Sequence, residues 1–283
     1  MDIISSLTDM QSRCLAERAA GKRIAFVPTM GFLHEGHASL LREGRRRGDV
    51  LALSIFVNPT QFGPSEDLDR YPRDLERDLA IARDAGVDLV WTPTPAQVYP
   101  PGYATWVNVE GLTDVLCGAS RPGHFRGVTT VVCKLFNVVQ PNVALFGEKD
   151  FQQLAVIRRM TADLDLPVEV VGMPIVREAD GLALSSRNVY LSADERRQAL
   201  AIPSALARAR ALAAAGERDG AAVLREVRAM IEAMPDARID YVQICHRATL
   251  AGQARIDADS VLLLAVFVGR TRLIDNGPLL AGA

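Results

Sequence analysis

Two histidines stand three positions apart in the segment Val27-Pro-Thr-Met-Gly-Phe-Leu-His-Glu-Gly-His37. An apolar strand leads into a turn of small residues and then a helix, so His34 and His37 share one face of its first turn. Backbone N–H groups at a helix start lack partners and the dipole is positive there, which favours an anion. The imidazoles add donors for phosphate oxygens, and Gly36 lets a flat group such as a purine approach the backbone. The segment therefore predicts a nucleotide-phosphate site.

Other interpretations of this histidine pair remain open. A His-x-x-His pair can bind a metal ion, although zinc sites of the His-Glu-x-x-His type place their histidines four apart. No cluster of further ligands stands out, so the sequence predicts no metal site made of dedicated protein ligands. The pair can also be two surface histidines at a helix start. The chain has only 4 histidines, however, and two of them fall on this one face, which favours a site.

A second candidate segment runs from Gly147 to Gln153, where another predicted strand ends in a glycine and a helix begins. Lys149 would direct a mobile cation to the carboxyl edge of a sheet. Asp150 is equally suited to cap the helix. Gln153 lies one turn further on, where a neutral amide suits a hydroxyl or carboxylate, although a lone glutamine is more often a surface residue.

A third candidate segment, Gly181-Leu-Ala-Leu-Ser-Ser-Arg-Asn188, places two hydroxyls beside a guanidinium. Such a loop can clamp a polyphosphate, and the alternative is an ordinary serine-rich turn with a solvated arginine. The sequence has neither a Gly-x-x-x-x-Gly-Lys-Ser/Thr loop nor a Gly-x-Gly-x-x-Gly turn after a strand, and no protein-kinase motif set. A nucleotide would therefore use the helix start that carries the histidines.

These segments follow predicted strands in an α/β pattern. Apolar runs predict strands, and helical periodicity predicts the helices between them. The predicted strands are Ile24–Pro28, Val50–Val57, Val87–Trp91, Val143–Phe146 and Val168–Val171. The predicted helices are Glu35–Arg47, Asp74–Ala85, Gly127–Val139 and Asp150–Leu164. This alternation predicts a parallel sheet with helices on both faces, which binds ligands beyond the carboxyl ends of its strands.

The composition changes after about residue 176, where a second, smaller α+β domain is predicted. Ser192-Ala-Asp-Glu195 is a capping box that opens a long helix, which Pro203 kinks or splits. A helix over about 220–234 and two strand-like segments, Ile239–Cys245 and Val261–Val268, follow. The predicted domains are residues 1–175 and residues 176–283, with no Pro/Gly/Ser-rich linker between them.

Composition and charge limit the class of protein. The chain has 283 residues, of which 49% are hydrophobic and 23% charged, as in an ordinary globular protein. A net charge of −2 gives no overall field for nucleic acid or an anionic membrane. Arg45–Arg47, at a predicted helix end, complements the helix dipole instead of forming a basic stripe. Neither nucleic acid nor a membrane is therefore an expected partner.

The sequence also predicts a cytoplasmic location. The N-terminus has no basic region before an apolar stretch, so no signal peptide is predicted. The longest apolar run, Val261–Val268, is too short to span a bilayer and predicts a buried strand. The cysteines form no close pair, which predicts reduced thiols; they are Cys14, Cys117, Cys133 and Cys245.

Taken together, the candidate segments resemble the pantothenate synthetase (pantoate–β-alanine ligase) family over essentially the whole chain. The matching pieces are VPTMGFLHEGH, SIFVNPTQF, RPGHFRGV, FGEKDFQQL and LSSRN, in the family's order and at its usual spacings. That family is part of a wider group of nucleotidylyl-transfer Rossmann-like proteins, which includes the class I aminoacyl-tRNA synthetases. Their His-x-Gly-His signature is similar to His34-Glu-Gly-His37, and Ser185-Ser186-Arg187 stands where their second, mobile phosphate-binding loop would be.

The resemblance implies a fold and a reaction. The fold would be a Rossmann-like domain that binds nucleotide and pantoate, followed by a small C-terminal lid. The carboxylate of pantoate would attack the α-phosphate of Mg·ATP and give pantoyl adenylate and pyrophosphate. The amine of β-alanine would then attack the adenylate, releasing AMP and pantothenate, the precursor of coenzyme A.

The resemblance also implies a role for individual residues. Catalytic roles fall to His37, as a proton donor, and to His34 and Lys149. Gln61 would contact pantoate and β-alanine, and Gln153 would bind pantoate. The implied ATP site is made of Pro28, Thr29, Met30, Gly31, Phe32, Leu33, His34, Glu35, Gly36, His37, Gly147, Glu148, Lys149, Asp150, Val176, Leu184, Ser185, Ser186 and Arg187.

Three further points follow from the resemblance. Leu184 stands where the family commonly has methionine, and a leucine keeps the volume and apolarity of that position. Arg121 and His124 match another family motif, for which a role in the site and a role in stabilising a turn are both open. The family resemblance implies a homodimer.

Two other functions compete with the ligase. A plain nucleotidylyltransferase, acting on a mononucleotide or on phosphopantetheine, would share the histidine motif without needing the two glutamines. A nucleotide-binding sensor would keep the ATP contacts but lose Lys149 or Gln61, both of which are present.

Overall fold

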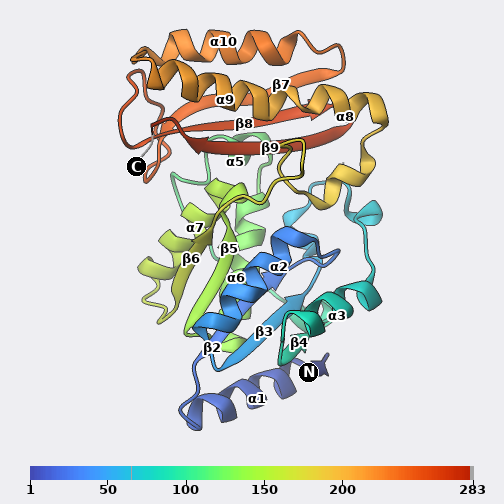
Figure 1. Cartoon of the computed structure of the whole chain (residues 1–283). Helices are drawn as coiled ribbons and strands as arrows, with labels where there is room; N and C mark the ends of the chain where they lie inside the picture. The colour runs from blue at the N-terminus through green and yellow to red at the C-terminus, as the bar shows by residue number, and fades with distance from the viewer. Residues whose placement is uncertain (65, 281–283) are drawn as a thin grey trace. The chain divides into compact units, whose positions relative to one another are not determined.

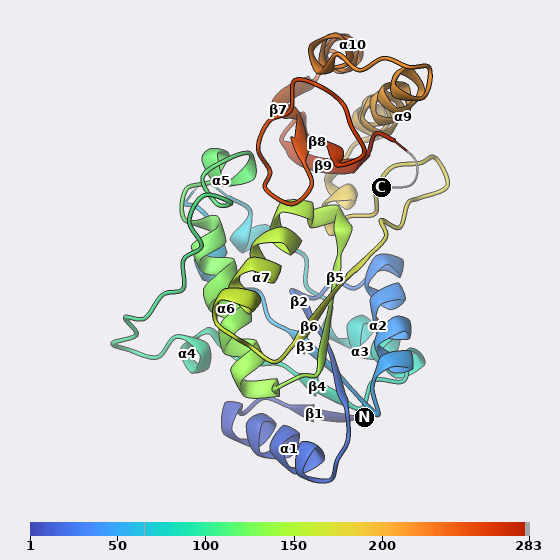
Figure 2. The same ribbon diagram turned by 90° about the vertical axis from the view of Figure 1, so that its left-hand side faces the viewer.

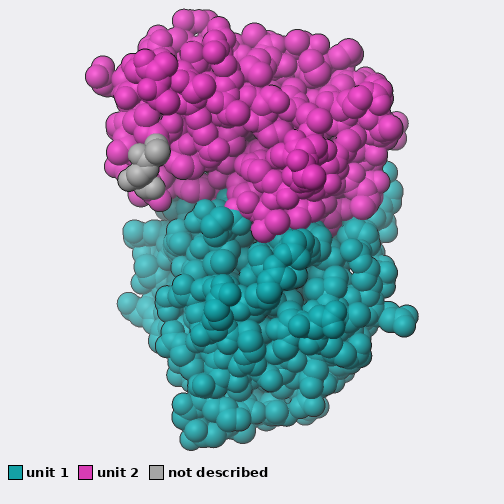
Figure 3. Space-filling model, in the orientation of Figure 1, with its two compact units in different colours: residues 1–114, 121–148, 153–174 teal, residues 115–120, 149–152, 175–283 magenta. Residues whose placement is uncertain are grey.

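The computed structural model describes residues 1–64 and 66–280, and they form two compact units. Figure 3 colours these units separately. Unit 1 comprises residues 1–114, 121–148 and 153–174, and unit 2 comprises residues 115–120, 149–152 and 175–283. Each unit is described by itself below. The two short segments 115–120 and 149–152 belong to unit 2 although they lie, by number, within the predicted first domain.

Unit 1 is built on a six-stranded sheet in the order β1-β4-β3-β2-β5-β6, with every neighbouring pair parallel (Figure 1). Its strands are β1 (Asp2–Ile4), β2 (Ile24–Thr29), β3 (Val50–Ile55), β4 (Leu89–Trp91), β5 (Val143–Gly147) and β6 (Glu169–Met173). The central strands are near-continuous apolar runs because both of their faces are covered. The α/β class predicted from the sequence is confirmed.

Helices cover both faces of this sheet. The longer ones are α1 (Leu7–Ala19), α2 (Glu35–Arg47), α3 (Leu75–Asp84), α6 (His124–Val139) and α7 (Phe151–Asp163), and α4 (Pro95–Val98) is short. Alternate strand residues such as Val27 and Leu53 pack with Leu41 of α2 and Ala82 of α3 in one buried cluster. Figure 2 shows α2 and α3 on one side of the sheet and α6 on the other.

The strand order creates a switch point beside β2. The chain passes from β2 to β3 on one side and later enters β5 on the other side of β2. In sheets of this kind, the loops at such a switch point run in opposite directions and leave a crevice in which ligands bind. The predicted segments around His34 and Gly147 leave the carboxyl ends of β2 and β5.

Unit 2 contains an antiparallel sheet of β7 (Ala237–His246), β8 (Ser260–Val268) and β9 (Thr271–Pro278), with β8 in the middle. The helices α9 (Ala201–Ala214) and α10 (Gly220–Glu232) pack on one face of it (Figure 1), and α8 (Ala193–Ala199) precedes them. The short helix α5 (Cys117–Ser120) also belongs to unit 2. The buried strand predicted at Val261–Val268 is β8, which is confirmed.

Some elements differ from the sequence expectation. The long helix divides at Leu200 into α8 and α9, and Pro203 lies in the first turn of α9, where its missing N–H removes no helical hydrogen bond. Helix α6 begins at His124, three residues before the predicted start. The sequence patterns did not reveal β1, α1 or β9. Strand β9 was not predicted because its polar residues interrupt the apolar pattern. In the structure, Asp275 and Asn276 of this strand form hydrogen bonds within unit 2.

Candidate active site

The loop after β2 is held by a carboxylate from α3. Gly31 and Phe32 both have left-handed backbone, with φ of 83° and 51°, and this directs successive N–H groups to one point. The N–H of Phe32 donates to Asp78 Oδ2 at 2.8 Å, and the N–H of Leu33 donates to Asp78 Oδ1 at 2.6 Å. A Cβ built on Gly31 would lie 3.0 Å from Asp78 Oδ2, so a glycine suits this close approach.

Asp78 is buried, with 1% of its surface exposed. Burial raises the pKa of its carboxyl, and the hydrogen bonds from Leu33 and Phe32 oppose that rise. The sequence did not identify this residue as part of the site. A signal was present, because Asp78 lies one helical turn before the buried Ala82, and a carboxylate on a buried helix face requires hydrogen-bond partners.

The start of α2 is capped by the two histidines. His34 is the N-cap residue, and its Nδ1 accepts the N–H of Gly36 at 3.1 Å. In return, the N–H of His34 donates to Nδ1 of His37 at 3.3 Å. The ring centroids are 4.1 Å apart. The imidazoles thus take the parts that a hydroxyl and a carboxylate play in an ordinary capping box.

This cap assigns the proton of each ring. A ring nitrogen that accepts a hydrogen bond carries no proton, so a neutral imidazole in this cap holds its proton on Nε2. His34 and His37 therefore each present an Nε2–H donor. Gly36 has a specific reason to be glycine, because a Cβ there would lie 2.8 Å from Cε1 of His34.

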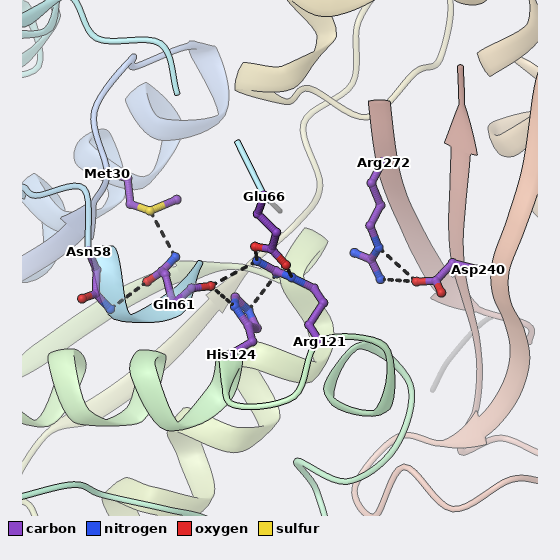
Figure 4. A network of polar contacts seen from close by, with 8 residues as sticks. All are labelled: Met30, Asn58, Gln61, Glu66, Arg121, His124, Asp240 and Arg272. Atoms are coloured by element: carbon purple, nitrogen blue, oxygen red, sulfur yellow. Dashed lines mark hydrogen bonds and ion pairs between the residues drawn. The ribbon is translucent and has the colours of Figure 1, made fainter. Parts of the chain in front are cut away.

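Gln61 ends the 3₁₀ turn η1 (Pro59–Gln61) after β3. Its Oε1 accepts from Nδ2 of Asn58 at 3.2 Å, and its Nε2 donates to the sulfur of Met30 at 3.1 Å (Figure 4). Asn58 Oδ1 in turn accepts from Thr60 Oγ1 and from the hydroxyl of Tyr99, both at 2.9 Å. An amide has two N–H groups and two lone pairs, so Gln61 has donor and acceptor capacity beyond these contacts.

The other predicted residues of unit 1 lie near strand ends. Gly147 ends β5 and pairs with Met173 of β6. A Cβ on Gly147 would meet no atom of the described residues within 4 Å, so the backbone is approachable there. Glu148 follows it in the 3₁₀ turn η3 (Glu148–Asp150), and Gln153 is a partly buried residue in the first turn of α7.

Unit 2 holds Lys149 and the serine-arginine segment. The main-chain carbonyl of Lys149 accepts Nδ2 of Asn276 at 2.9 Å. Burial lowers the pKa of the Lys149 ammonium; Asp150 and Asp275 raise it, whereas Arg187 and Arg272 lower it. Arg187 is therefore close enough to Lys149 for the two cations to repel each other.

Two further contacts order the segment around Ser185. The N–H of Leu184 donates to the carbonyl of Val176 at 3.0 Å, which joins two predicted ATP residues. Ser185 Oγ accepts the N–H of Arg187 at 3.3 Å and caps the 3₁₀ helix η4 (Ser186–Tyr190). The segment is thus an ordered turn that carries both serines and Arg187.

Strand β9 supplies residues that sequence reasoning missed. Asp275 is 2% exposed and receives two hydrogen bonds from Arg177, at 2.7 and 2.8 Å. Asp275 Oδ1 also accepts the N–H of the next residue, Asn276, at 2.8 Å. Figure 4 includes another ion pair that starts on this strand, between Arg272 and Asp240.

The predicted site residues are therefore distributed over both units. Unit 1 carries Pro28–His37, Gln61, Gly147, Glu148 and Gln153, and unit 2 carries Lys149, Asp150, Val176 and Leu184–Arg187. Within unit 1, Gln61 contacts Met30, and within unit 2, Leu184 bonds to Val176. That both groups surround one triphosphate stays a prediction.

Two properties of the described residues bear on the class of site. Residues 1–64 and 66–280 contain no group of three or more His, Cys, Asp or Glu side chains arranged to hold a metal ion. None of their helices is long and apolar enough to cross a bilayer.

Comparisons with known proteins identify the family of the chain. A family model described as pantoate-beta-alanine ligase matches residues 2–278. A protein of Syntrophotalea carbinolica named pantothenate synthetase is 67% identical, over 99% of both chains. A protein of Trichlorobacter lovleyi with the same name is 60% identical, over 98% of both.

Solved structures of the same family are similar to this chain over nearly its whole length. The crystal structure of pantothenate synthetase from Thermus thermophilus is similar with a TM-score of 0.94 and 48% identity, and covers 99% of each chain. A pantoate-beta-alanine ligase from Francisella tularensis, complexed with beta-gamma ATP and beta-alanine, is similar with a TM-score of 0.82 and 31% identity. It covers 99% of this chain and 98% of its own.

Proposed function

The chain belongs to the pantoate–β-alanine ligase family, and we propose that its paired-imidazole helix start is where ATP is activated in the ligase reaction. The enzyme condenses pantoate with β-alanine at the expense of ATP, and gives pantothenate, AMP and pyrophosphate. In the first step a carboxylate oxygen of pantoate bonds to the α-phosphorus as the bond to pyrophosphate breaks. In the second the amine of β-alanine attacks the carbonyl carbon of pantoyl adenylate, and AMP leaves.

The observation that carries the proposal is the reciprocal cap of His34 and His37. Each ring uses Nδ1 to accept a backbone N–H, so Nε2–H is the proton that each can donate to a phosphate oxygen. His37 is proposed as the proton donor of the reaction. Donors fixed before ATP arrives need no reorganisation as negative charge develops, which is why preorganised sites lower barriers.

The loop 28–36 is proposed to surround the adenosine and phosphates of ATP. Asp78 supports this, because it fixes the N–H groups of Phe32 and Leu33 at the centre of the loop. The residues Gly147 and Glu148 at the end of β5 are proposed to complete the site from unit 1.

Unit 2 is proposed to supply cations to the same triphosphate. The charge of Arg187 lowers the pKa of the Lys149 ammonium, and an anion bound beside them would relieve that repulsion. The remaining ATP contacts are proposed for Asp150, Val176 and Leu184–Ser186. Magnesium is proposed to enter with the phosphates as Mg·ATP, and it is part of the substrate.

Gln61 and Gln153 are proposed to select the acid. A buried amide that loses its hydroxyl partner is left unpaired, so acids without that hydroxyl are expected to be poor substrates. Gln61 is also proposed to contact β-alanine. Its amide is already oriented by Asn58 and Met30, which supports a fixed recognition role.

Three broader features are proposed on the family resemblance: a homodimer, a cytoplasmic location, and residues 176–283 acting as a lid after a domain of residues 1–175. Sedimentation equilibrium of the full chain tests the first. A monomer at micromolar concentration would refute it.

A pyrophosphate-release assay tests the function itself. With ATP and pantoate alone, the chain is expected to release about one equivalent of pyrophosphate per site, since the adenylate stays bound; added β-alanine makes release continuous. Release that does not require pantoate would refute the proposal and favour a plain nucleotidylyltransferase.

A further inference from the structure

The turn that carries Gln61 is packed against the first turns of α6. A Cβ built on Gly127 would lie 2.4 Å from the carbonyl oxygen of Thr60 and 2.8 Å from the nitrogen of Gln61. Asn58 Nδ2 also donates to the carbonyl of Gly127 at 3.1 Å. Backbone therefore lies directly on backbone, and any shift at the start of α6 moves the Gln61 turn.

Two side chains at this start converge on one atom, the main-chain carbonyl oxygen of Gln61. Nδ1 of His124 lies 2.8 Å from it, and Nη2 of Arg121 lies 3.2 Å from it (Figure 4). A carbonyl oxygen only accepts, so His124 must carry its proton on Nδ1. Nε2 of the neutral ring is then an acceptor, and it faces Nη1 of Arg121 at 3.1 Å.

Glu66 fixes the arginine of this group. Nε of Arg121 donates to Glu66 Oε1 at 2.7 Å, and Nη2 donates to Oε2. Burial alone would raise the pKa of Glu66, but the hydrogen bond and charge of Arg121 outweigh it and hold the pKa below its ordinary value. Glu66 is therefore ionised, and it balances the charge of Arg121.

We propose that Glu66, Arg121 and His124 are positioning residues that clamp the main-chain carbonyl of Gln61 and so direct its amide to the acid substrate. The inference rests on the proposed role of Gln61 in binding pantoate. It assigns a role to the Arg-Pro-Gly-His segment through main-chain placement. Arg121 supports the carbonyl of Gln61, and it does not bind a substrate carboxylate, because Glu66 already neutralises the charge of its guanidinium.

The first test uses side chains that replace one ring nitrogen at a time. Asparagine can place an N–H donor near the position of Nδ1, and glutamine near that of Nε2. His124→Asn is expected to keep the KM for pantoate within about three-fold, whereas His124→Gln and His124→Leu raise it about ten-fold through the lost hydrogen bond. The KM for ATP is expected to stay within about two-fold in all three. His246→Gln, at a partly exposed histidine of β7, is the matched control and leaves both constants unchanged.

Three outcomes would overturn the clamp. The KM for pantoate could stay unchanged in His124→Leu, or rise equally in the asparagine and glutamine variants. The KM values for ATP and pantoate could also rise together, which indicates general loss of structure. The asparagine and glutamine variants give the decisive comparison if the leucine variant does not fold.

The second test is a double-mutant cycle between His124→Leu and Gln61→Ala, measured as kcat/KM for pantoate. If His124 acts through Gln61, the double variant is no slower than Gln61→Ala alone, within about two-fold. Independent, multiplying effects would overturn the clamp. The Gln61→Ala variant alone distinguishes failure of the proposed function from failure of the clamp. If its KM for pantoate is unchanged, the proposed role of Gln61 is refuted. If its KM for pantoate rises but that of His124→Leu does not, only the clamp is refuted.

Discussion

The side-chain amide of Asn276 donates a hydrogen bond to the main-chain carbonyl of Lys149 across 2.9 Å, although 127 residues separate them in the chain. This bond fastens the 3₁₀ turn η3 to strand β9. The next residue back on that strand, Asp275, is buried and paired with Arg177, so Asn276 is itself held in a rigid setting. The main chain at Lys149 is therefore held by a strand far along the sequence.

Replacing Asn276 by alanine is expected to lower kcat/KM for ATP about ten-fold while Lys149 is retained, because one hydrogen bond that orients the turn is lost. Steady-state kinetics with ATP varied measures this. Asn137→Ala is the control, since that exposed amide bonds within its own helix. A value equal to that of the unmodified enzyme would show that the turn holds its shape without Asn276.

Removing the charged or donating groups themselves is expected to cost more. Lys149→Ala and His37→Ala should each reduce kcat by about two to three orders of magnitude, because one well-placed donor contributes ~3 kcal/mol to a transition state of this kind. Circular dichroism should show an unchanged fold. Turnover within a few-fold of the unmodified enzyme at saturating ATP would contradict the assignment.

The carboxylate of Asp78 is expected to matter for both stability and ATP binding. Asp78→Asn keeps one acceptor oxygen but replaces the other with an NH₂ group, which cannot accept a hydrogen bond. One of the two backbone N–H groups is then buried without a partner, and this lowers the free energy of unfolding by ~1–3 kcal/mol. The KM for ATP should rise because the loop at Phe32 and Leu33 loosens. Urea denaturation and initial rates measure the two effects. Asp84→Asn, on the exposed end of the same helix, provides the comparison, and equal behaviour of the two variants would rule out the support role.

The pH dependence of kcat/KM for ATP is expected to report Lys149, since this ratio reflects ionisations of the free enzyme. Burial lowers the pKa of the Lys149 ammonium. The protonated form is the one that attracts phosphate, so activity is present below that pKa and is lost as the pH rises through it. The loss should begin below the ordinary range for lysine, which is about 10.4.

Lys149→Arg tests the assignment of this alkaline limb. Arginine stays charged throughout, so the limb should move to higher pH even if the maximal rate falls. Lys22→Arg, at an exposed lysine, should leave the profile in place. An alkaline limb that is the same in Lys149→Arg as in the unmodified enzyme would assign it to another group.

Local signals made much of unit 1 predictable. The helix Glu35–Arg47 was predicted with the bounds that the structure shows, because the signals for its two ends are local. The cap residue His34 directly precedes its first residue, and Arg45–Arg47 form its last turn. The parallel sheet followed from the apolar runs. The role of His34 and His37 as a reciprocal cap was not foreseen, since it depends on ring orientation and not only on spacing.

What the sequence did not reveal depends on distant partners. Asp78 bonds to an N–H group 45 residues away, and Asn276 bonds across 127 residues. No local periodicity encodes such contacts. Strand β9 was missed for the same reason: Asp275 looks like a solvent-facing residue until Arg177, from a separate segment, is seen to neutralise it.

The contact between Gly127 and Thr60 has a consequence for comparing relatives of this enzyme. No side chain fits at position 127 while the neighbouring main chain stays where it is. A homologue with any other amino acid there must have moved the turn that carries Gln61, the residue proposed to bind the acid, so a change of acid is the natural first question to ask of it. One column of an alignment could thus sort orthologues from enzymes that have diverged to new substrates.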